Sequence, residues 1–148
     1  MKLSENFSLA EFTRTGRDLE NVPNAAQINA MMELCDNVLE LVREHFKKPI
    51  IITSGFRSAA VNAAVGGSLT SQHSKGEAAD FHIVGVANSD IWQFIVNNCC
   101  FDQCIAEKLD KKNGAKGWCH VSYKPRGNRH QELSYVNGKY LKGLVFEK

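Results

Sequence analysis

The chain has 148 residues and a net charge of +2, and 43% of its residues are hydrophobic. These are ordinary values for one globular domain, and a chain of this size buries enough surface to fold without disulfides. The small net charge gives no sign of the basic patch that nucleic-acid binding requires. No run approaches the roughly 18 apolar residues of a membrane span. We expect a single domain over residues 1–148 that neither binds nucleic acid nor spans a membrane.

The cysteines and the N-terminal segment indicate the cellular compartment in which the protein is made. There are five cysteines, an odd number that includes the adjacent pair Cys99 and Cys100. This is a poor disulfide framework and indicates a reducing compartment. The N-terminus has no apolar core of the length that a signal peptide needs. We expect a protein that is made in the cytoplasm and either acts there or leaves by a route other than a cleaved signal.

The first part of the chain is predicted to be helical. Ser8 and Glu11 have the capping-box spacing, which predicts a short helix within "NFSLAEFTR". Asn24 and Gln27 repeat this spacing, and apolar residues then recur at helical intervals. They predict a long amphipathic helix from about Ala25 to Phe46.

Short strands dominate the rest of the chain. The apolar, β-branched run "PIIITSGF" is typical of a buried strand, "SAAVNAAVGG" of a brief helix, and the Ser- and Gly-rich residues 68–77 of a loop. "NSDIWQFIVNNC" predicts a further helix, and strands are predicted at "AADFHIV", "QCIAEKL" and "GWCHVSYK". "ELSYVNGKYLKG" alternates around Asn137-Gly138, a strong hairpin signal. This order predicts an α+β fold with helices packed on a largely antiparallel sheet.

The stretch "SQHSKGEAADFHI" places metal-binding side chains around a turn of small residues. Catalytic zinc usually takes three His or acidic ligands and leaves its fourth position to water. His73 and Asp80 could provide two of these ligands. Gly76 lets the loop bend sharply, while Ala78 and Ala79 keep the surroundings uncrowded. The pattern therefore points to zinc, with a third ligand from a distant segment.

"GWCHVSY" and "DQCIAEKL" offer the missing parts of such a site. His120 lies between apolar strand residues, where its ring nitrogens need a partner. Glu107 is a carboxylate in a strand that is otherwise largely apolar, and a partly desolvated carboxylate has the raised pKa of a general base. Arg57 follows a predicted strand, and arginine binds carboxylates bidentately.

These segments together resemble a known family. "SQHSKGEAAD" fits S-x-H-x-x-G-x-A-x-D, a signature of the zinc D-Ala-D-Ala peptidases. These enzymes are LAS metallopeptidases, a group that also contains the Hedgehog signalling-domain fold. "ITSGFRS", "VNAAVGGS" and "WCHVSY" are similar to further family segments in the same order, and the helical N-terminal part resembles phage and bacterial members. The resemblance extends roughly from Asn6 to Tyr123.

The resemblance implies a Hedgehog/DD-peptidase-like fold with Zn²⁺ held by His73, Asp80 and His120. It implies hydrolysis of a peptide bond in peptidoglycan stem peptides, either as a D-Ala-D-Ala carboxypeptidase or as an L-Ala-D-Glu endopeptidase. Arg57 matches the substrate-binding arginine of the family, and Ser71 its signature serine near the substrate. The missing signal peptide suggests a phage or prophage endolysin, which would reach the cell wall through a holin.

The chain departs from the family pattern at one position. Many members carry a catalytic acid three residues before the last histidine, where this chain has Gly117. Glu107 matches the "DQ-x-I-x-E" segment of the phage-like branch, so we assign it the role of base. His82 lies two residues beyond Asp80 and is expected to be structural or to support the ligands, and His130 receives no role.

A non-catalytic reading stays open. The Hedgehog branch of the fold includes zinc-binding modules, so the chain could instead bind peptidoglycan or a protein partner without cleaving it. Glu107 and Arg57 favour the enzyme, because a binding module needs neither a base nor a substrate anchor.

Overall fold

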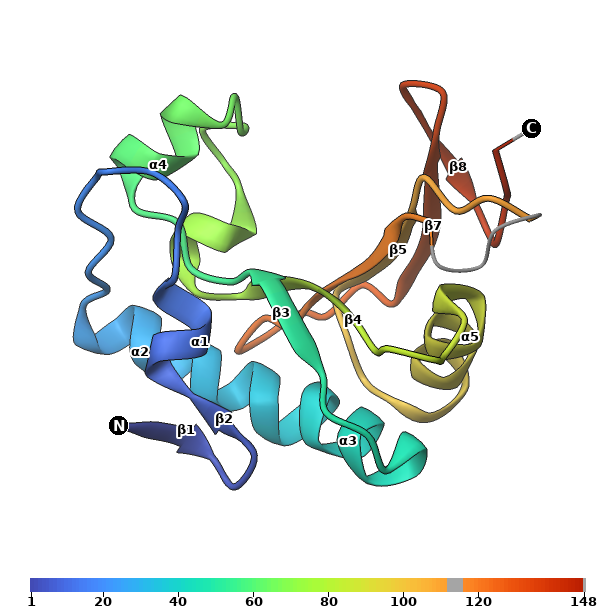
Figure 1. The fold of residues 1–148 in the computed structure, drawn as a ribbon, viewed down its shortest axis with the longest axis horizontal. Coiled ribbons are helices and arrows are strands. Elements are labelled where there is room, and N and C mark those ends of the chain that lie inside the picture. The colour runs from blue at the N-terminus through green and yellow to red at the C-terminus, as the bar shows by residue number, and fades with distance from the viewer. Residues whose placement is uncertain (112–115, 148) are drawn as a thin grey trace.

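The computed structural model describes residues 1–111 and 116–147 and is built on a mixed sheet with its two longest helical segments on one face (Figure 1). The sheet has six strands in the order β3-β4-β6-β5-β7-β8. All neighbouring strands are antiparallel except β5 and β7, which are parallel. The strands are β3 (Ile51–Ser54), β4 (Ala78–His82), β5 (Gln103–Glu107), β6 (Trp118–Ser122), β7 (Gln131–Val136) and β8 (Lys139–Lys142). The predicted α+β class with a largely antiparallel sheet is confirmed.

The N-terminal segment begins with a small hairpin that the sequence did not predict, β1 (Lys2–Ser4) with β2 (Phe7–Ser8). Helix α1 (Leu9–Thr13) follows, and its predicted capping box is present. The Ser8 hydroxyl accepts a hydrogen bond from the Glu11 backbone N–H, and the Glu11 carboxylate accepts one from the Ser8 N–H. These two bonds satisfy backbone donors that the first helical turn leaves unpaired.

The predicted long helix over 25–46 is confirmed, with one irregular turn inside it. It consists of α2 (Ala25–Leu34), a π-helical turn (Cys35–Leu39) and α3 (Glu40–Phe46). The π turn contacts strand β1. Directly after it, the Glu40 carboxylate accepts hydrogen bonds from Ser4 Oγ and the Asn6 backbone N–H. The helix ends at Lys47, whose φ of 54° is left-handed.

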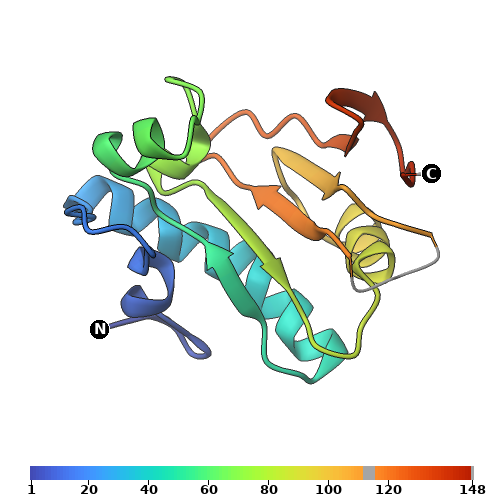
Figure 2. The same ribbon diagram turned by 45° about the horizontal axis from the view of Figure 1, so that its top comes forward.

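The two faces of the sheet differ in what covers them. One face packs against the long helix and α5 (Asn88–Asn98), as Figure 2 shows. Its buried side chains are Ala79, Phe81, Cys104, Ala106, Cys119 and Val121. Because strand side chains alternate, the residues between them point to the opposite face. That face carries Asp80, His120 and Glu107 and is left uncovered by these helices.

Two local predictions need correction. The run at Ile51–Ser54 is not a buried strand, because β3 lies at the edge of the sheet and Ile51 is exposed. The predicted loop over 68–77 contains a 3₁₀ turn, Gln72–Lys75, which follows α4 (Ala59–Ala64). The position of a strand within a sheet depends on distant partners, and a single 3₁₀ turn leaves no periodicity in the sequence.

The C-terminal hairpin is confirmed. Asn137 and Gly138 both have positive φ, 51° and 79°, as the tight turn requires. All five cysteines are free thiols. Within residues 1–111 and 116–147, no helix has the length and apolar character needed to span a membrane.

Candidate metal centre

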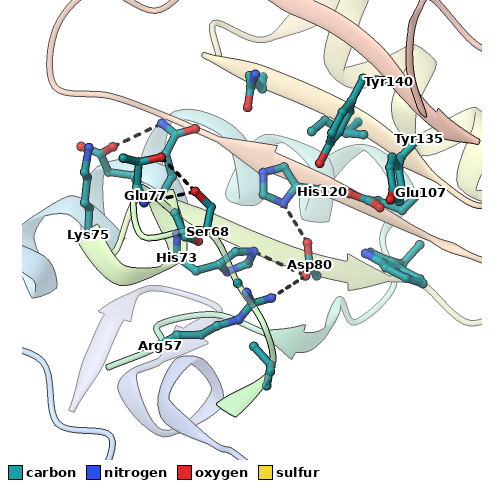
Figure 3. Close-up of a pocket in the computed structure, with 18 of the residues that line it drawn as sticks. Arg57, Ser68, His73, Lys75, Glu77, Asp80, Glu107, His120, Tyr135 and Tyr140 are labelled. Atoms are coloured by element: carbon teal, nitrogen blue, oxygen red, sulfur yellow. Dashed lines mark hydrogen bonds and ion pairs between the residues drawn. The ribbon is translucent and has the colours of Figure 1, made fainter. Parts of the chain in front are cut away.

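An open cleft with a volume of about 670 Å³ lies on the uncovered face of the sheet. One wall is the segment over residues 65–77, which runs from the end of α4 through the 3₁₀ turn. The other wall consists of side chains from β5, β6 and the β7–β8 hairpin (Figure 3). The cleft therefore exposes the central strands between two flanking walls.

Three side chains with metal-binding atoms meet on the floor of this cleft. His73, Asp80 and His120 each offer one ligand atom, and these atoms all lie within 4.8 Å of one another. Asp80 and His120 are direct partners in the register of β4 and β6, and the 3₁₀ turn supplies His73. The structure thus brings together the three residues that the sequence selected as ligands.

The protein fixes the orientation of both imidazoles. The Nδ1 atom of the buried His73 lies 2.8 Å from the carbonyl oxygen of Gly55. A carbonyl only accepts, so Nδ1 carries a proton, and Nε2 is the ring nitrogen that faces Asp80 and could bind a metal. For His120, Nδ1 lies 2.8 Å from Asp80 Oδ1. Each histidine therefore presents one nitrogen to the same point.

Asp80 is held in its ionised form. Burial alone would raise the pKa of this carboxyl, but the adjacent His73 and His120 more than offset the burial and hold the pKa well below its usual range. Arg57 places a positive charge nearby, with Nη2 at 3.5 Å from Asp80 Oδ2. A carboxylate that stays ionised is suited to bind a cation.

The donor set fits zinc. Two imidazole nitrogens and a carboxylate oxygen are ligands of catalytic zinc, whose bonds of about 2.0–2.2 Å place neighbouring ligands about 3.3 Å apart. The separations here are 2.8 Å from His120 Nδ1 to Asp80 Oδ1 and 3.4 Å from His73 Nε2 to Asp80 Oδ2, which bracket that spacing. Three protein ligands leave a tetrahedral ion one position for water or substrate.

Glu107 lies beside this centre on the next strand. Its register partner on β6 is Trp118, two residues before His120, so Glu107 and His120 share a face of the sheet. Burial raises the pKa of Glu107 to about 7 from its ordinary 4.5; the positive charge of His120 opposes the rise and the negative charge of Asp80 adds to it. A carboxylate with this pKa can both take and return a proton near neutral pH.

The raised pKa of Glu107 predicts a pH-dependent stability of the metal-free protein. Because the folded state binds this proton more tightly than the unfolded state does, stability falls as pH rises from 4.5 to about 7. Glu107→Gln removes this loss. Its advantage over the wild type should grow by about 1–3 kcal/mol between pH 5 and pH 8.

Urea unfolding in the presence of a chelator measures this difference. Glu132→Gln is the matched control, because Glu132 lies on the neighbouring β7 with an exposed side chain. A stability difference for Glu107→Gln that does not change with pH would show that Glu107 ionises normally.

Gly117, where many relatives have a catalytic acid, has no room for a side chain. Its φ is +85°, and a Cβ atom would lie 2.3 Å from the carbonyl oxygen of Glu107. The close approach of Gly117 to β5 therefore excludes an acid at this position. Glu107, on the strand that Gly117 approaches, is a carboxylate that lines the cleft.

Gly76, the glycine of the signature, fixes the ligand loop against the long helix. Its φ is +76°, and a Cβ would lie 2.3 Å from the carbonyl oxygen of Gln27. The Gln27 side chain also donates a hydrogen bond to the carbonyl oxygen of Ser74. The first turn of α2 thus supports the turn that carries His73.

Gly76→Ala is expected to destabilise the metal-free protein by about 2–4 kcal/mol, from left-handed backbone strain and a clash with backbone. Gly66→Ala is the control, since Gly66 has a similar φ of +74° but nothing within 4 Å of its Cβ position. Urea unfolding of both variants separates the clash from the strain. Equal losses of stability in the two variants would contradict a supporting role for the Gly76 contact.

Arg57 and Ser71 both line the cleft. Arg57 Nε donates to Ser54 Oγ, which aims the guanidinium at Asp80. The Ser71 hydroxyl accepts a hydrogen bond from the His73 backbone N–H and so caps the 3₁₀ turn. His82 is not part of the ligand cluster, and His130 lies outside the cleft lining, where its ring packs on Phe101.

One part of the cleft wall was not predicted from the sequence. Tyr135 and Tyr140 line the cleft from the β7–β8 hairpin, and their rings pack with centroids 4.7 Å apart. The Asn137-Gly138 turn fixes their pairing, so the sequence could have shown that the two tyrosines share a face. It could not show that this face borders the cleft, since that depends on the parallel pairing of β7 with β5.

An α+β sheet that carries a two-histidine, one-aspartate centre beside a desolvated glutamate is typical of metal-dependent hydrolases. A family model, peptidase M15, matches residues 5–121. This is most of the chain, and the protein belongs to the peptidase M15 family, whose members are metal-dependent peptidases. No curated protein sequence matches the chain significantly.

Proposed function

We propose that this protein is a zinc peptidase that hydrolyses stem peptides of peptidoglycan. The observation that carries the proposal is the placement of Glu107, whose pKa is raised to about 7, on the same sheet face as His120. A centre that only bound metal would gain nothing from a desolvated carboxylate at this place. The peptidoglycan substrate is supported by the signature around His73 and Asp80.

Each residue of the site has a separate role in the proposed reaction. A zinc ion held by His73, Asp80 and His120 would polarise the scissile carbonyl and acidify the attacking water. Glu107 accepts a proton from that water as its oxygen adds to the carbonyl carbon. It returns the proton to the amine nitrogen as the C–N bond breaks. Arg57 lines the cleft beside Asp80 and is placed to bind a substrate carboxylate.

The resemblance to phage members supports a lysin role within this proposal. Such a protein is made in the cytoplasm and cleaves the wall from within, after passing a holin pore. Free cysteines are compatible with this route, since synthesis takes place in a reducing compartment.

Defined stem peptides incubated with the zinc-loaded protein test the proposal, with products identified by mass spectrometry. We expect chelator-sensitive cleavage, and the product masses separate loss of a terminal D-Ala from a cut between L-Ala and D-Glu. Zinc binding without cleavage of any stem peptide would refute the enzyme and favour the non-catalytic binding module.

A further inference from the structure

A row of side chains crosses four strands on the cleft face of the sheet. Trp118 on β6 pairs with Glu107 on β5, Glu107 pairs with Tyr135 on β7, and Tyr135 pairs with Tyr140 on β8. Direct partners in neighbouring strands place their side chains on the same face. The C-terminal hairpin therefore extends the wall that begins at the general base.

This hairpin lies outside the part of the chain that the family model matches. The match ends at residue 121, whereas β7 and β8 cover Gln131–Val136 and Lys139–Lys142. Tyr135 and Tyr140 therefore belong, with Lys124 and Arg129, to the part of the cleft lining that lies beyond the matched region. Any role of theirs has to be inferred from their position.

Tyr140 lines the cleft and is nevertheless 62% exposed to solvent. Its ring packs against that of Tyr135 at an interplanar angle of 38°. Figure 3 shows its hydroxyl pointing toward the side of the cleft that holds His120. Partial burial raises the pKa of the Tyr140 phenol, and the charges of Glu107 and Asp80 add to the rise, so the hydroxyl stays a donor.

A hydrogen-bond donor beside the scissile carbonyl would add to the stabilisation that a zinc ion supplies. When water adds to the scissile carbonyl, negative charge builds up on the carbonyl oxygen, and a donor placed there stabilises the transition state. Trp118 also lines the cleft, but its Nε1 atom is fully buried and cannot meet a substrate without rearrangement. Arg129 lines the cleft too, and its guanidinium is bound bidentately by the buried Asp102. Tyr140 is accessible, protonated and supported by an aromatic partner.

We propose that Tyr140 is a further catalytic residue, whose hydroxyl donates a hydrogen bond to the carbonyl oxygen of the scissile bond as negative charge builds up on it. This role rests on the proposed peptidase function. The tilted packing against Tyr135 restricts the ring, so that less side-chain freedom is lost when the substrate binds. The substrate is then held between Arg57 on one side and the hairpin on the other.

Tyr140→Phe removes the hydroxyl and keeps the ring that packs on Tyr135. We expect kcat on a stem peptide to fall about tenfold to a hundredfold, with KM changed less than about threefold, since the bond forms mainly in the transition state. Zinc content should equal that of the wild type. Tyr123→Phe is the matched control, because Tyr123 packs against the core and does not line the cleft.

Binding of a phosphinate dipeptide, measured by calorimetry on the zinc-loaded protein, gives a second readout. Its tetrahedral phosphorus carries charged oxygens like those of the transition state, so Tyr140→Phe should weaken its binding by a factor similar to the loss in kcat. An unchanged kcat, or a rise in KM alone, would overturn the proposal.

This second readout also separates the two proposals. If the wild type cleaves no stem peptide, the peptidase function fails, and phosphinate binding decides the role of Tyr140. Weaker binding by Tyr140→Phe would then support the hydrogen bond on its own. Equal binding by both proteins, or no binding by the wild type, would overturn it.

Discussion

Replacing Glu107 by Gln is expected to lower kcat by about a hundredfold to ten-thousandfold, the usual contribution of general acid–base catalysis. The amide has the shape of the carboxyl group but cannot accept the proton of the attacking water. Glu107 is not one of the three clustered ligands, so the variant should bind zinc as tightly as the wild type. Steady-state kinetics on a stem peptide, together with metal analysis, measure both quantities.

Glu132→Gln serves again as control, because it makes the same chemical change on the adjacent strand, at a side chain that is 42% exposed. Its kcat should equal that of the wild type. Full activity of Glu107→Gln would show that another group takes the proton, and loss of zinc from that variant would show that Glu107 supports the metal instead.

The second large effect is expected from His120→Ala. It removes one of the three ligands and leaves Asp80 without its 2.8 Å partner. Zinc affinity should fall by more than about a hundredfold, the upper end of what loss of an outer partner of a ligand costs. Turnover should be lost with the metal. Calorimetric zinc titration and zinc content after dialysis measure the change.

His82→Ala tests whether this loss is specific to the cluster. His82 lies on the same strand as Asp80, two residues further on, but does not belong to the ligand group. Its removal should leave zinc affinity within about threefold of the wild type, because His82 neither belongs to the cluster nor lines the cleft. A similar loss of zinc in both variants would mean that the ligand set is wrong.

Features encoded over a few residues could be predicted from the sequence. The two capping boxes, the Asn137-Gly138 turn and the long helix follow from residue types at fixed short spacings. The residues of the candidate metal cluster could be predicted for a related reason. His73 and Asp80 are seven positions apart around a glycine turn, and His120 lies on a strand with a recognisable pattern.

Features that depend on distant partners could not be predicted. The edge position of β3 and the parallel pairing of β5 with β7 are decided by which strands meet after the chain has folded. The same applies to Gly117, whose closeness to the Glu107 carbonyl is visible only in three dimensions. Tyr140 is another such feature. The strand face that it shares with Tyr135 could be predicted, but the cleft residues near it could not.

The parallel pairing of β5 with β7 also has a consequence for folding. The two strands are separated by β6 in the chain, so β5 can pair with β6 early while its other edge waits for residues 131–136. During that interval Cys104, Ile105 and Ala106 offer unsatisfied backbone groups and apolar side chains to any other chain nearby. We therefore expect a higher yield of refolded protein at low protein concentration, where self-association competes less with closure of the sheet.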